Sequence, residues 1–231
     1  MHQVSIPQHI IDRVRAVRGR DHIFDGIDLS KTAHVIVDMQ VGFVAPGAPI
    51  EVPMTRQISD TINTISSAVR AGGGVNVFTR YTYDPSEKIS WDLWFKTLGV
   101  TQLAAQAKMG PGMPDWQIDP CMEVKDGDIV VDKTRFSALI PGTCDMDEQL
   151  KARGVDTLII SGTLTNCCCE STARDAQQMG YKVIFMSDAN ATLSDEEHLG
   201  TLISMYTIFA DVMDTPYLLG LIDKSAQAKA A

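Results

Sequence analysis

Residues 158–175 read LIISGTLTNCCCESTARD, an apolar run followed by a turn of small residues with three cysteines and then by a helix-forming segment. This order predicts a β-strand that ends in a turn and continues into an α-helix. Such a turn lies at the carboxyl edge of a sheet and at the amino end of a helix, where backbone N–H groups and the helix dipole favour a thiolate. We therefore expect the chemistry of the protein in this turn.

Strands and helices alternate over most of the chain. Near-continuous apolar runs predict buried strands at residues 33–40, 75–81, 156–162 and 181–189, and at the start of 127–139. Helical patterns lie between them at residues 54–71, 143–154, 167–180 and 194–212. Parallel strands need crossover connections, and the crossovers cover both faces of the sheet. The prediction is an α/β fold, a three-layer αβα sandwich with a mostly parallel central sheet.

One large domain accounts for most of the 231 residues, because no shift in composition divides the chain. The expected parts are an N-terminal extension (residues 1–30), the domain (31–222) and a frayed tail (223–231). Apolar residues recur at helical spacing in the extension, at Ile6, Ile10, Val14 and Val17. A transit peptide could show this pattern, but Asp12 and Asp21 interrupt its basic character. A helix that packs on the body or on a neighbouring subunit is favoured.

The composition argues against several classes of partner. Asp and Glu number 29 against 20 Lys and Arg, for a net charge of −9, so no overall positive field attracts nucleic acid or an anionic membrane. No apolar run approaches the roughly 18 residues that cross a bilayer. The five cysteines are an odd number and three are adjacent, which favours reduced thiols over a disulfide framework. We expect a cytoplasmic protein without nucleic-acid or membrane partners.

Three reactive groups stand directly after predicted strands. Asp38 follows the first strand, Lys133 follows the third, and a cysteine of the triplet 167–169 follows the fourth. The carboxyl ends of parallel strands meet at one edge of a sheet, so these side chains are expected to lie close together. A carboxylate can take the proton of a thiol, while an ammonium holds the carboxylate ionised and stabilises developing negative charge. The set suffices for acyl transfer.

Each of these residues alone also has a structural explanation. An aspartate after a strand can cap a helix or form an ion pair, and a lysine there can do the latter. Buried cysteines usually pack as small hydrophobic residues. The triplet is not expected to bind a metal, since contiguous thiols lack the usual spacing of zinc ligands. Only the coincidence of the three groups favours catalysis.

The segments VDMQ, DKTRFS and GTLTNCCCESTARDA, in this order and spacing, resemble the isochorismatase-like cysteine hydrolases. This superfamily includes nicotinamidases, N-carbamoylsarcosine amidohydrolases and ureidoacrylate amidohydrolases, and the resemblance covers roughly residues 30–215. It implies an isochorismatase-like fold. It also implies a catalytic triad in which Cys168 is the nucleophile, Asp38 the general base and Lys133 the third member. Cys167 and Cys169 then fall where the family commonly has apolar residues.

The resemblance further implies an oxyanion site in the turn. The family's cis peptide bond would lie between Thr163 and Leu164 and would aim the N–H of Leu164, with that of Cys168, at the oxyanion. Asn166 would pin the turn. Because Cys168 would combine the helix terminus with Asp38 and Lys133, we expect it to be the thiol with the lowest pKa.

Departures from family members narrow the expected substrate. The namesake of the family cleaves a vinyl ether and lacks the cysteine, so the cysteine here favours amide or ureide hydrolysis. Nicotinamidases carry an Asp-x-His…His metal site after the second strand, but RYTYDPSEKISW (residues 80–91) has no histidine, so we expect no metal and no cofactor. KTRFSAL (residues 133–139) looks most like the matching segment of ureidoacrylate amidohydrolases. Arg135 could there bind a carboxylate or ureido oxygen, or form an ion pair instead.

The resulting hypothesis is an amidohydrolase that cleaves a linear C–N bond in a small carbamoyl or ureido compound through a thioester. Gln40, Tyr81, Trp91 and Asn166 are further candidates for substrate binding, although Trp91 could equally fill the core or a subunit interface. By the same resemblance we expect a homo-oligomer, a dimer or a tetramer. The alternatives are a nicotinamidase-like hydrolase of another small amide, or a non-catalytic member of the fold that binds small molecules or senses thiol oxidation.

Overall fold

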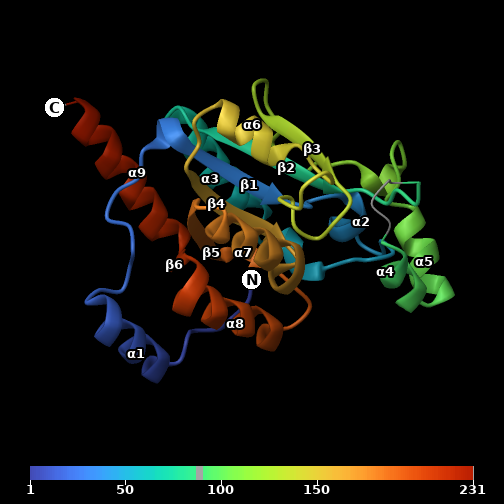
Figure 1. Ribbon diagram of the computed structural model, residues 1–231, viewed down its shortest axis with the longest axis horizontal. Helices are drawn as coiled ribbons and strands as arrows, with labels where there is room; N and C mark the ends of the chain where they lie inside the picture. The colour runs from blue at the N-terminus through green and yellow to red at the C-terminus, as the bar shows by residue number, and fades with distance from the viewer. Residues whose placement is uncertain (87–90, 231) are drawn as a thin grey trace.

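The central sheet is built by strands from the whole length of the chain. A computed structural model describes residues 1–86 and 91–230 (Figure 1). In this part of the chain six strands pair in parallel, in the order β3-β2-β1-β4-β5-β6. They are β1 (Thr32–Val37), β2 (Val75–Tyr81), β3 (Ile129–Lys133), β4 (Thr157–Thr163), β5 (Lys182–Ala191) and β6 (Asp211–Met213). All pairs are parallel, which confirms and sharpens the prediction of a mostly parallel sheet.

Helices cover both faces of this sheet. One face packs on α3 (Ser59–Ala71), α9 (Thr215–Ala230) and the short α2 (Val41–Val44), and the other on α6 (Met146–Ala152), α7 (Glu170–Gln178) and α8 (Asp195–Ser204). Every residue of β1 and of β4 is buried, as the β-branched runs predict for strands that are covered on both faces. Two hydrophobic clusters result, one on each side of the sheet, and the three-layer αβα prediction is confirmed.

Short elements fill the connections. Two small helices, α4 (Asp92–Thr97) and α5 (Val100–Ala107), lie between β2 and β3. Turns of 3₁₀-helix lie at η1 (Leu29–Lys31), η2 (Pro53–Gln57) and η3 (Pro114–Trp116), and π-helical turns at η4 (Thr165–Cys169) and η5 (Met205–Phe209). In Figure 1, α2, α4 and α5 lie beyond the ends toward which the arrows of β1, β2 and β3 point.

Several predicted boundaries move in the structure. The helix expected at residues 54–71 begins at Ser59, after η2. The helix expected at 194–212 has its N-cap at Ser194 but leaves α-helical geometry after Ser204, and β6 follows it. β6 is only three residues long and begins with the buried Asp211, so no apolar run in the sequence predicts this strand. The tail expected at 223–231 is helical to residue 230 as part of α9.

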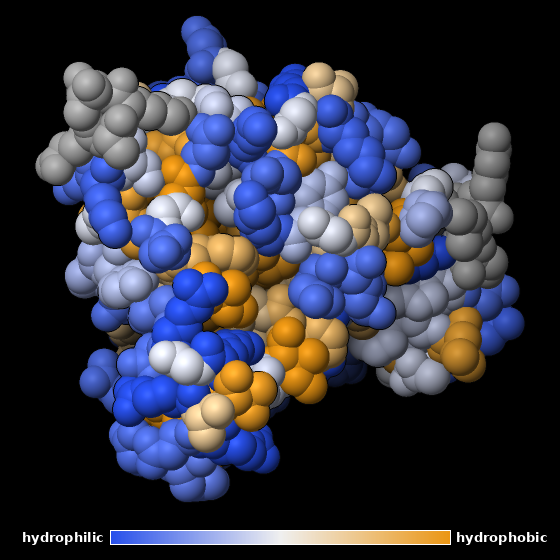
Figure 2. All heavy atoms as spheres, turned by 60° about the vertical axis from the view of Figure 1, so that its left-hand side comes forward, coloured by the Kyte–Doolittle hydropathy of each residue, from blue (hydrophilic) through white to orange (hydrophobic). Residues whose placement is uncertain are grey.

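The extension forms α1 (Gln8–Arg18), as the spacing of its apolar residues predicts. Val14 is buried against the main core, whereas Val17 is 85% exposed. The segment after α1 is held by Asp211, whose carboxylate accepts the N–H groups of Ile23 and Phe24. On the face shown in Figure 2, hydrophilic residues surround a central group of hydrophobic ones. None of the helices in the described ranges is both long and apolar enough to traverse a bilayer.

The strand order places a crevice at one edge of the sheet. The connections run outward in opposite directions from β1 and β4, so their crossovers lie on opposite faces. Between the carboxyl ends of two such strands a crevice forms, and ligands of parallel α/β sheets bind there. Asp38 follows β1 and the cysteine triplet follows β4, so both reach this point of the fold.

Candidate active site

A buried ion pair joins the ends of β1 and β3. Lys133, the last residue of β3, places its Nζ 2.7 Å from Oδ2 of Asp38, and neither side chain is exposed. Lys133 also donates to the carbonyl oxygen of Arg135 at 3.0 Å. Asp38 has a positive φ of 51°, which is uncommon for a residue other than glycine and typical of functional sites. The backbone thus turns sharply at the point where β1 delivers its carboxylate.

The two oxygens of Asp38 have different surroundings. Oδ1 accepts the hydroxyl of Thr79 at 2.8 Å, and the Asp38 N–H in turn points to Thr79. Oδ2 meets Lys133 and has no further partner among the described residues. Burial lowers the pKa of Lys133, but the Asp38 carboxylate and the Cys168 thiol raise it by more, so the lysine stays cationic. Oδ2 is therefore the oxygen that can accept another proton.

The cysteine turn, residues 163–169, begins where β4 crowds against β1. Gly162 has a φ of 117°, and a Cβ there would collide with the carbonyl group of Val37, so only glycine fits. The peptide bond between Thr163 and Leu164 is cis. The chain then enters η4, in which the carbonyl oxygen of Leu164 accepts the N–H groups of Cys167 and Cys169. Cys168 is the next-to-last residue of η4 and is 3% exposed.

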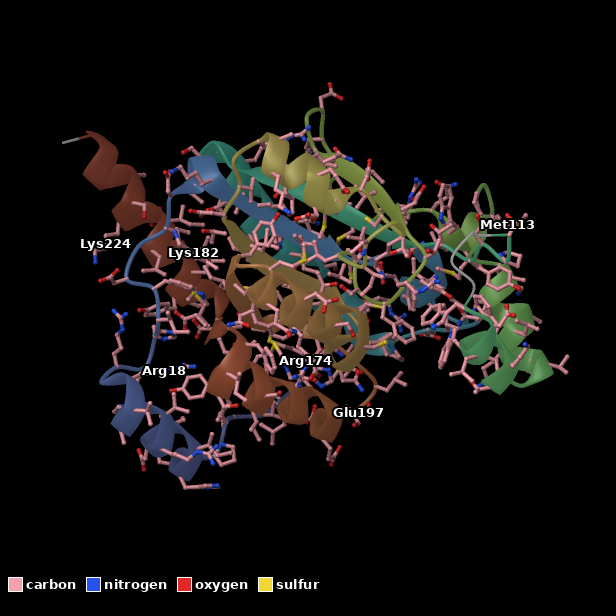
Figure 3. All side chains as sticks on the ribbon, in the orientation of Figure 1. Arg18, Met113, Arg174, Lys182, Glu197 and Lys224 are labelled. Atoms are coloured by element: carbon pink, nitrogen blue, oxygen red, sulfur yellow. The ribbon has the colours of Figure 1, made fainter. Side chains whose placement is uncertain are left out.

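The connection after β5 and the helices α7 and α8 hold the turn in place. The hydroxyl of Thr192 donates to Oδ1 of Asn166 at 2.6 Å, and Thr165 is hydrogen bonded to His198 at 2.9 Å. Behind the turn, Arg174 projects from α7 toward α8 (Figure 3). Its guanidinium donates to Glu170 and to Ser204, so α7 and α8 are tied together. These contacts fix the direction in which η4 presents its thiols.

Two neighbouring thiols share a hydrogen bond in this turn. This contact raises the pKa of Cys168, as does burial, whereas the same contact lowers the pKa of Cys167. The expectation that Cys168 is the thiol with the lowest pKa is therefore wrong. The physical reason is that complete burial and the bond to Cys167 outweigh the stabilising charge of Lys133. The raised pKa favours the neutral thiol of Cys168, and the Asp38 carboxylate is one of the groups that raise it.

A cavity of about 570 Å³ opens over the turn and is called the Cys168 cavity below. Cys167, Cys168, Leu164 and Asn166 form its floor. Its walls come from the loop after α2, from Tyr81 at the end of β2, from α4 and α5, and from Phe136. Lys133 lies 5.6 Å from the centre of the Tyr81 ring, so the ion pair sits directly behind this wall.

The other predicted binding residues do not line this cavity. Gln40 is buried and holds the backbone together, because its side chain accepts the N–H of Tyr81 and donates to the carbonyl oxygens of Tyr81 and Trp116. Arg135 and Trp91 line a second, smaller hollow of about 300 Å³, the Arg135 hollow. There the guanidinium of Arg135 lies 4.9 Å from the centre of the Trp91 ring.

Several residues of the site escape sequence reasoning. Thr79 supports Asp38, Trp94 and Phe136 form part of the cavity wall, and Glu51 contributes a carboxylate to it. Thr79 could have been found as the polar residue near the end of the second predicted strand. The others come from connections without a periodic pattern. In the described part of the chain, no group of three or more His, Cys, Asp or Glu side chains is arranged to hold a metal ion.

Comparisons with known proteins identify the family that the chain is similar to. A model of the isochorismatase domain matches residues 32–216. The isochorismatase family protein YwoC of Bacillus subtilis (strain 168) is 37% identical over 178 residues, which cover 76% of this chain and 86% of that protein. The ureidoacrylate amidohydrolase RutB of Variovorax paradoxus (strain S110) is 30% identical over 179 residues, or 71% and 70% of the two chains. The crystal structure of a cysteine hydrolase from Pseudomonas syringae pv. phaseolicola 1448A superposes with a TM-score of 0.79 at 28% identity, over 89% of this chain and 99% of that one.

Proposed function

Because this chain belongs to the isochorismatase family of hydrolases, we propose that it is a cysteine amidohydrolase that cleaves the linear C–N bond of a small carbamoyl or ureido compound. One observation carries the proposal. The fully buried Asp38–Lys133 pair, 2.7 Å apart, lies behind a cavity onto which the Cys168 thiol opens. The similarity to a ureidoacrylate amidohydrolase supports an amide or ureide as the substrate.

The first half of the reaction forms a thioester. Oδ2 of Asp38 takes the proton of the Cys168 thiol while Sγ attacks the carbonyl carbon of the substrate. The carbonyl oxygen becomes an oxyanion, which the backbone N–H groups of Leu164 and Cys168 stabilise; one such donor is worth about 3 to 4 kcal/mol. Asp38 then gives its proton to the leaving nitrogen, and the C–N bond breaks. Ammonia or an amine leaves, and the acyl or carbamoyl group stays on Sγ.

The second half uses water. Asp38 takes a proton from a water molecule that attacks the thioester carbon, and the proton returns to Sγ as the C–S bond breaks. The products are an acid or a carbamate and the free thiol. Lys133 stays protonated throughout, because Asp38 and Cys168 raise its pKa. Its charge compensates the negative charge that passes between the carboxylate, the sulfur and the oxyanion.

The test is the release of ammonia by Cys168→Ala and Cys168→Ser proteins against a panel of ureides, biuret-like compounds and primary amides. Both variants are expected to lose at least about 1,000-fold in kcat/KM, since the attacking Sγ of Cys168 is removed. Cys121→Ala, which changes a thiol outside the cavity, serves as the matched control. Wild-type rates of ammonia release by both Cys168 variants would contradict the proposal. Absence of any covalent adduct on Cys168 with every turned-over substrate would favour a non-covalent route.

A further inference from the structure

The walls of the Cys168 cavity are mainly apolar. Six hydrophobic side chains face it from four different connections: Phe43, Ile50, Val52, Phe136, Leu164 and Leu193. Contact between an apolar wall and an apolar ligand is favourable, because both surfaces are removed from water. A charged group against the same wall loses the hydration that it had in water. The cavity therefore discriminates against charge wherever no opposite charge compensates it.

The charge that the cavity does carry is negative. Four of the described lining residues can ionise: Glu51, the thiols Cys167 and Cys168, and Tyr81. Glu51 is the carboxylic acid among them, and none of the described lining residues is a Lys, Arg or His. The N–H of Gly47 and the guanidinium of Arg56 lower the pKa of Glu51, so it is a carboxylate at neutral pH. Its partner Arg56 donates to the carbonyl oxygen of Val44 as well. A substrate carboxylate in this cavity would meet a like charge.

Arg135, the cation that the sequence offers for a substrate carboxylate, lies behind an aromatic wall. The wall consists of Trp91, Trp94 and Phe136, whose ring centres are 4.8 to 5.7 Å apart. Trp94 and Phe136 face the Cys168 cavity, whereas Trp91 faces the Arg135 hollow and stacks with the guanidinium. The second cation of this region, Lys133, is already paired with Asp38.

The cavity also offers uncharged hydrogen-bonding groups. Tyr81 is 3% exposed, and its hydroxyl has no partner among the residues that the structure describes. Nε1 of Trp94 and Oε1 of Gln106 are also buried atoms without a partner among the described residues, although their side chains are only partly buried. All three residues line the cavity. Buried polar atoms are nearly always paired in proteins, so unpaired ones on a cavity wall point to a ligand. A ligand that completes them carries both acceptor and donor atoms.

We propose that the Cys168 cavity selects uncharged amides or ureides with an apolar or aromatic body and rejects substrates that carry a carboxylate. This inference rests on the proposed function, because it names the substrate class of that same site. It separates this chain from an enzyme for ureidoacrylate, which is itself a carboxylate. Neutral hydrogen-bonding atoms of the substrate are bound by Tyr81, Trp94 and Gln106.

The test uses two substrates that share one ring, 4-methylbenzamide and 4-carbamoylbenzoate, with ammonia release as the readout. The first carries a methyl group where the second carries a carboxylate. The neutral amide is expected to exceed the anionic one in kcat/KM by at least about 100-fold. Equal values, or a preference for the carboxylate, would overturn the inference and leave the proposed amidohydrolase function standing.

A binding measurement decides the question even if neither amide is turned over. An aldehyde adds to a thiol when Sγ bonds to the carbonyl carbon and the thiol proton passes to the oxygen, so it blocks Cys168 reversibly. 4-Methylbenzaldehyde is expected to protect Cys168 from iodoacetamide at a concentration at least about tenfold lower than 4-formylbenzoate does. Equal protection, stronger protection by the anion, or no protection by either would overturn the inference. Amide hydrolysis that survives Cys168→Ala contradicts the proposed function instead.

The role of Glu51 has a test of its own. Glu51→Gln removes the carboxylate and leaves Arg56 uncompensated beside the cavity, so the discrimination between the two aldehydes should shrink by about fivefold. Protection by the neutral aldehyde should stay within about twofold of wild type. Glu123→Gln, which removes an exposed carboxylate paired with Lys125, is the matched control and should change neither value. A Glu51→Gln protein that matches this control would overturn the assignment of the selectivity to Glu51.

Discussion

The Cys168 cavity and the Arg135 hollow lie on two sides of one aromatic wall and differ in chemical character. The cavity, about 570 Å³, is lined mainly by apolar side chains and opens onto the thiols. The hollow, about 300 Å³, is lined by Arg135, Lys96, Asp84 and Asp92 beside its aromatic rings. Lys133 and Arg135 are only two residues apart, yet the first reaches the ion pair behind the cavity and the second lines the hollow.

This difference shows how far the position of Lys133 predicts the positions of the residues that follow it in the sequence. β3 ends at Lys133, so the alternation that governs side chains within a strand no longer applies at Arg135. The guanidinium of Arg135 donates to the carbonyl oxygen of Thr134 and lies against the ring of Trp91, a residue more than forty positions earlier in the chain. Catalysis and substrate contact should therefore depend on residues of the cavity, whereas residues of the hollow should be dispensable for both.

The largest contrast is expected between two aspartates, Asp38 after β1 and Asp132 in β3. Asp38→Asn removes the base and leaves Lys133 as an uncompensated buried charge. kcat should fall at least about 1,000-fold, and the free energy of unfolding should fall by about 3 to 5 kcal/mol. Asp132→Asn breaks the exposed pair of Asp132 with Arg80 and should cost at most about 1 kcal/mol and leave kcat within about twofold. Ammonia release and urea denaturation measure both quantities. Comparable losses in kcat for the two variants would contradict the assignment of the base.

The aromatic wall provides the next contrast, between neighbours in sequence. Phe136→Ala opens the cavity wall and should lower kcat/KM for a neutral amide by about 10- to 100-fold, since it removes apolar contact with the substrate. Arg135→Gln changes a side chain of the hollow and keeps the backbone carbonyl that accepts the Lys133 bond, so kcat/KM should stay within about threefold. Steady-state kinetics with circular dichroism as a check of folding separate the two. A larger loss for Arg135→Gln would place substrate binding in the hollow.

Two tyrosines at the end of β2 sharpen the comparison further. Tyr81 lines the cavity and Tyr83 lines the hollow. Burial raises the pKa of Tyr81, so its hydroxyl is a donor at every working pH. Tyr81→Phe should lower kcat/KM by about tenfold while leaving the free energy of unfolding within about 1 kcal/mol, because the hydroxyl has no partner in the described protein. Tyr83→Phe should leave kcat/KM within about twofold. Equal effects of the two variants would remove the hydroxyl of Tyr81 from substrate binding.

Much of the fold was readable because the central strands are buried on both faces. Segments such as AHVIVDMQ and DTLIISG are continuous apolar runs, and their order predicts a parallel sheet and the edge at which Asp38 and the cysteine triplet meet. β6 was not readable, since three residues that begin with aspartate carry no such pattern. α4 and α5 were equally obscure, because none of their residues is buried deeply enough to impose a hydrophobic period.

The candidate site was readable only in part, for a related reason. Asp38, Lys133 and Cys168 stand at strand ends, whose positions follow from the sheet. The cavity walls come from connections, and their arrangement depends on tertiary contacts such as those of Trp94 with Phe136. The pKa order of Cys167 and Cys168 depends on a hydrogen bond between adjacent side chains and on the burial of each, and neither can be seen in the letters CCC.

The smallest expected effect lies inside the cavity, between its two thiols. Cys167→Ala removes the hydrogen bond that raises the pKa of Cys168, so more Cys168 is thiolate at a given pH, and iodoacetamide should alkylate it about three- to tenfold faster at pH 8. Rates are measured by mass mapping against Cys144→Ala, which alters a thiol outside the cavity and should leave Cys168 unchanged. In the wild type, Cys167 should be labelled first, since its pKa is the lowered one. A slower or unchanged reaction of Cys168 in Cys167→Ala would mean that burial alone, and not the neighbouring thiol, keeps the nucleophile protonated until Asp38 takes its proton.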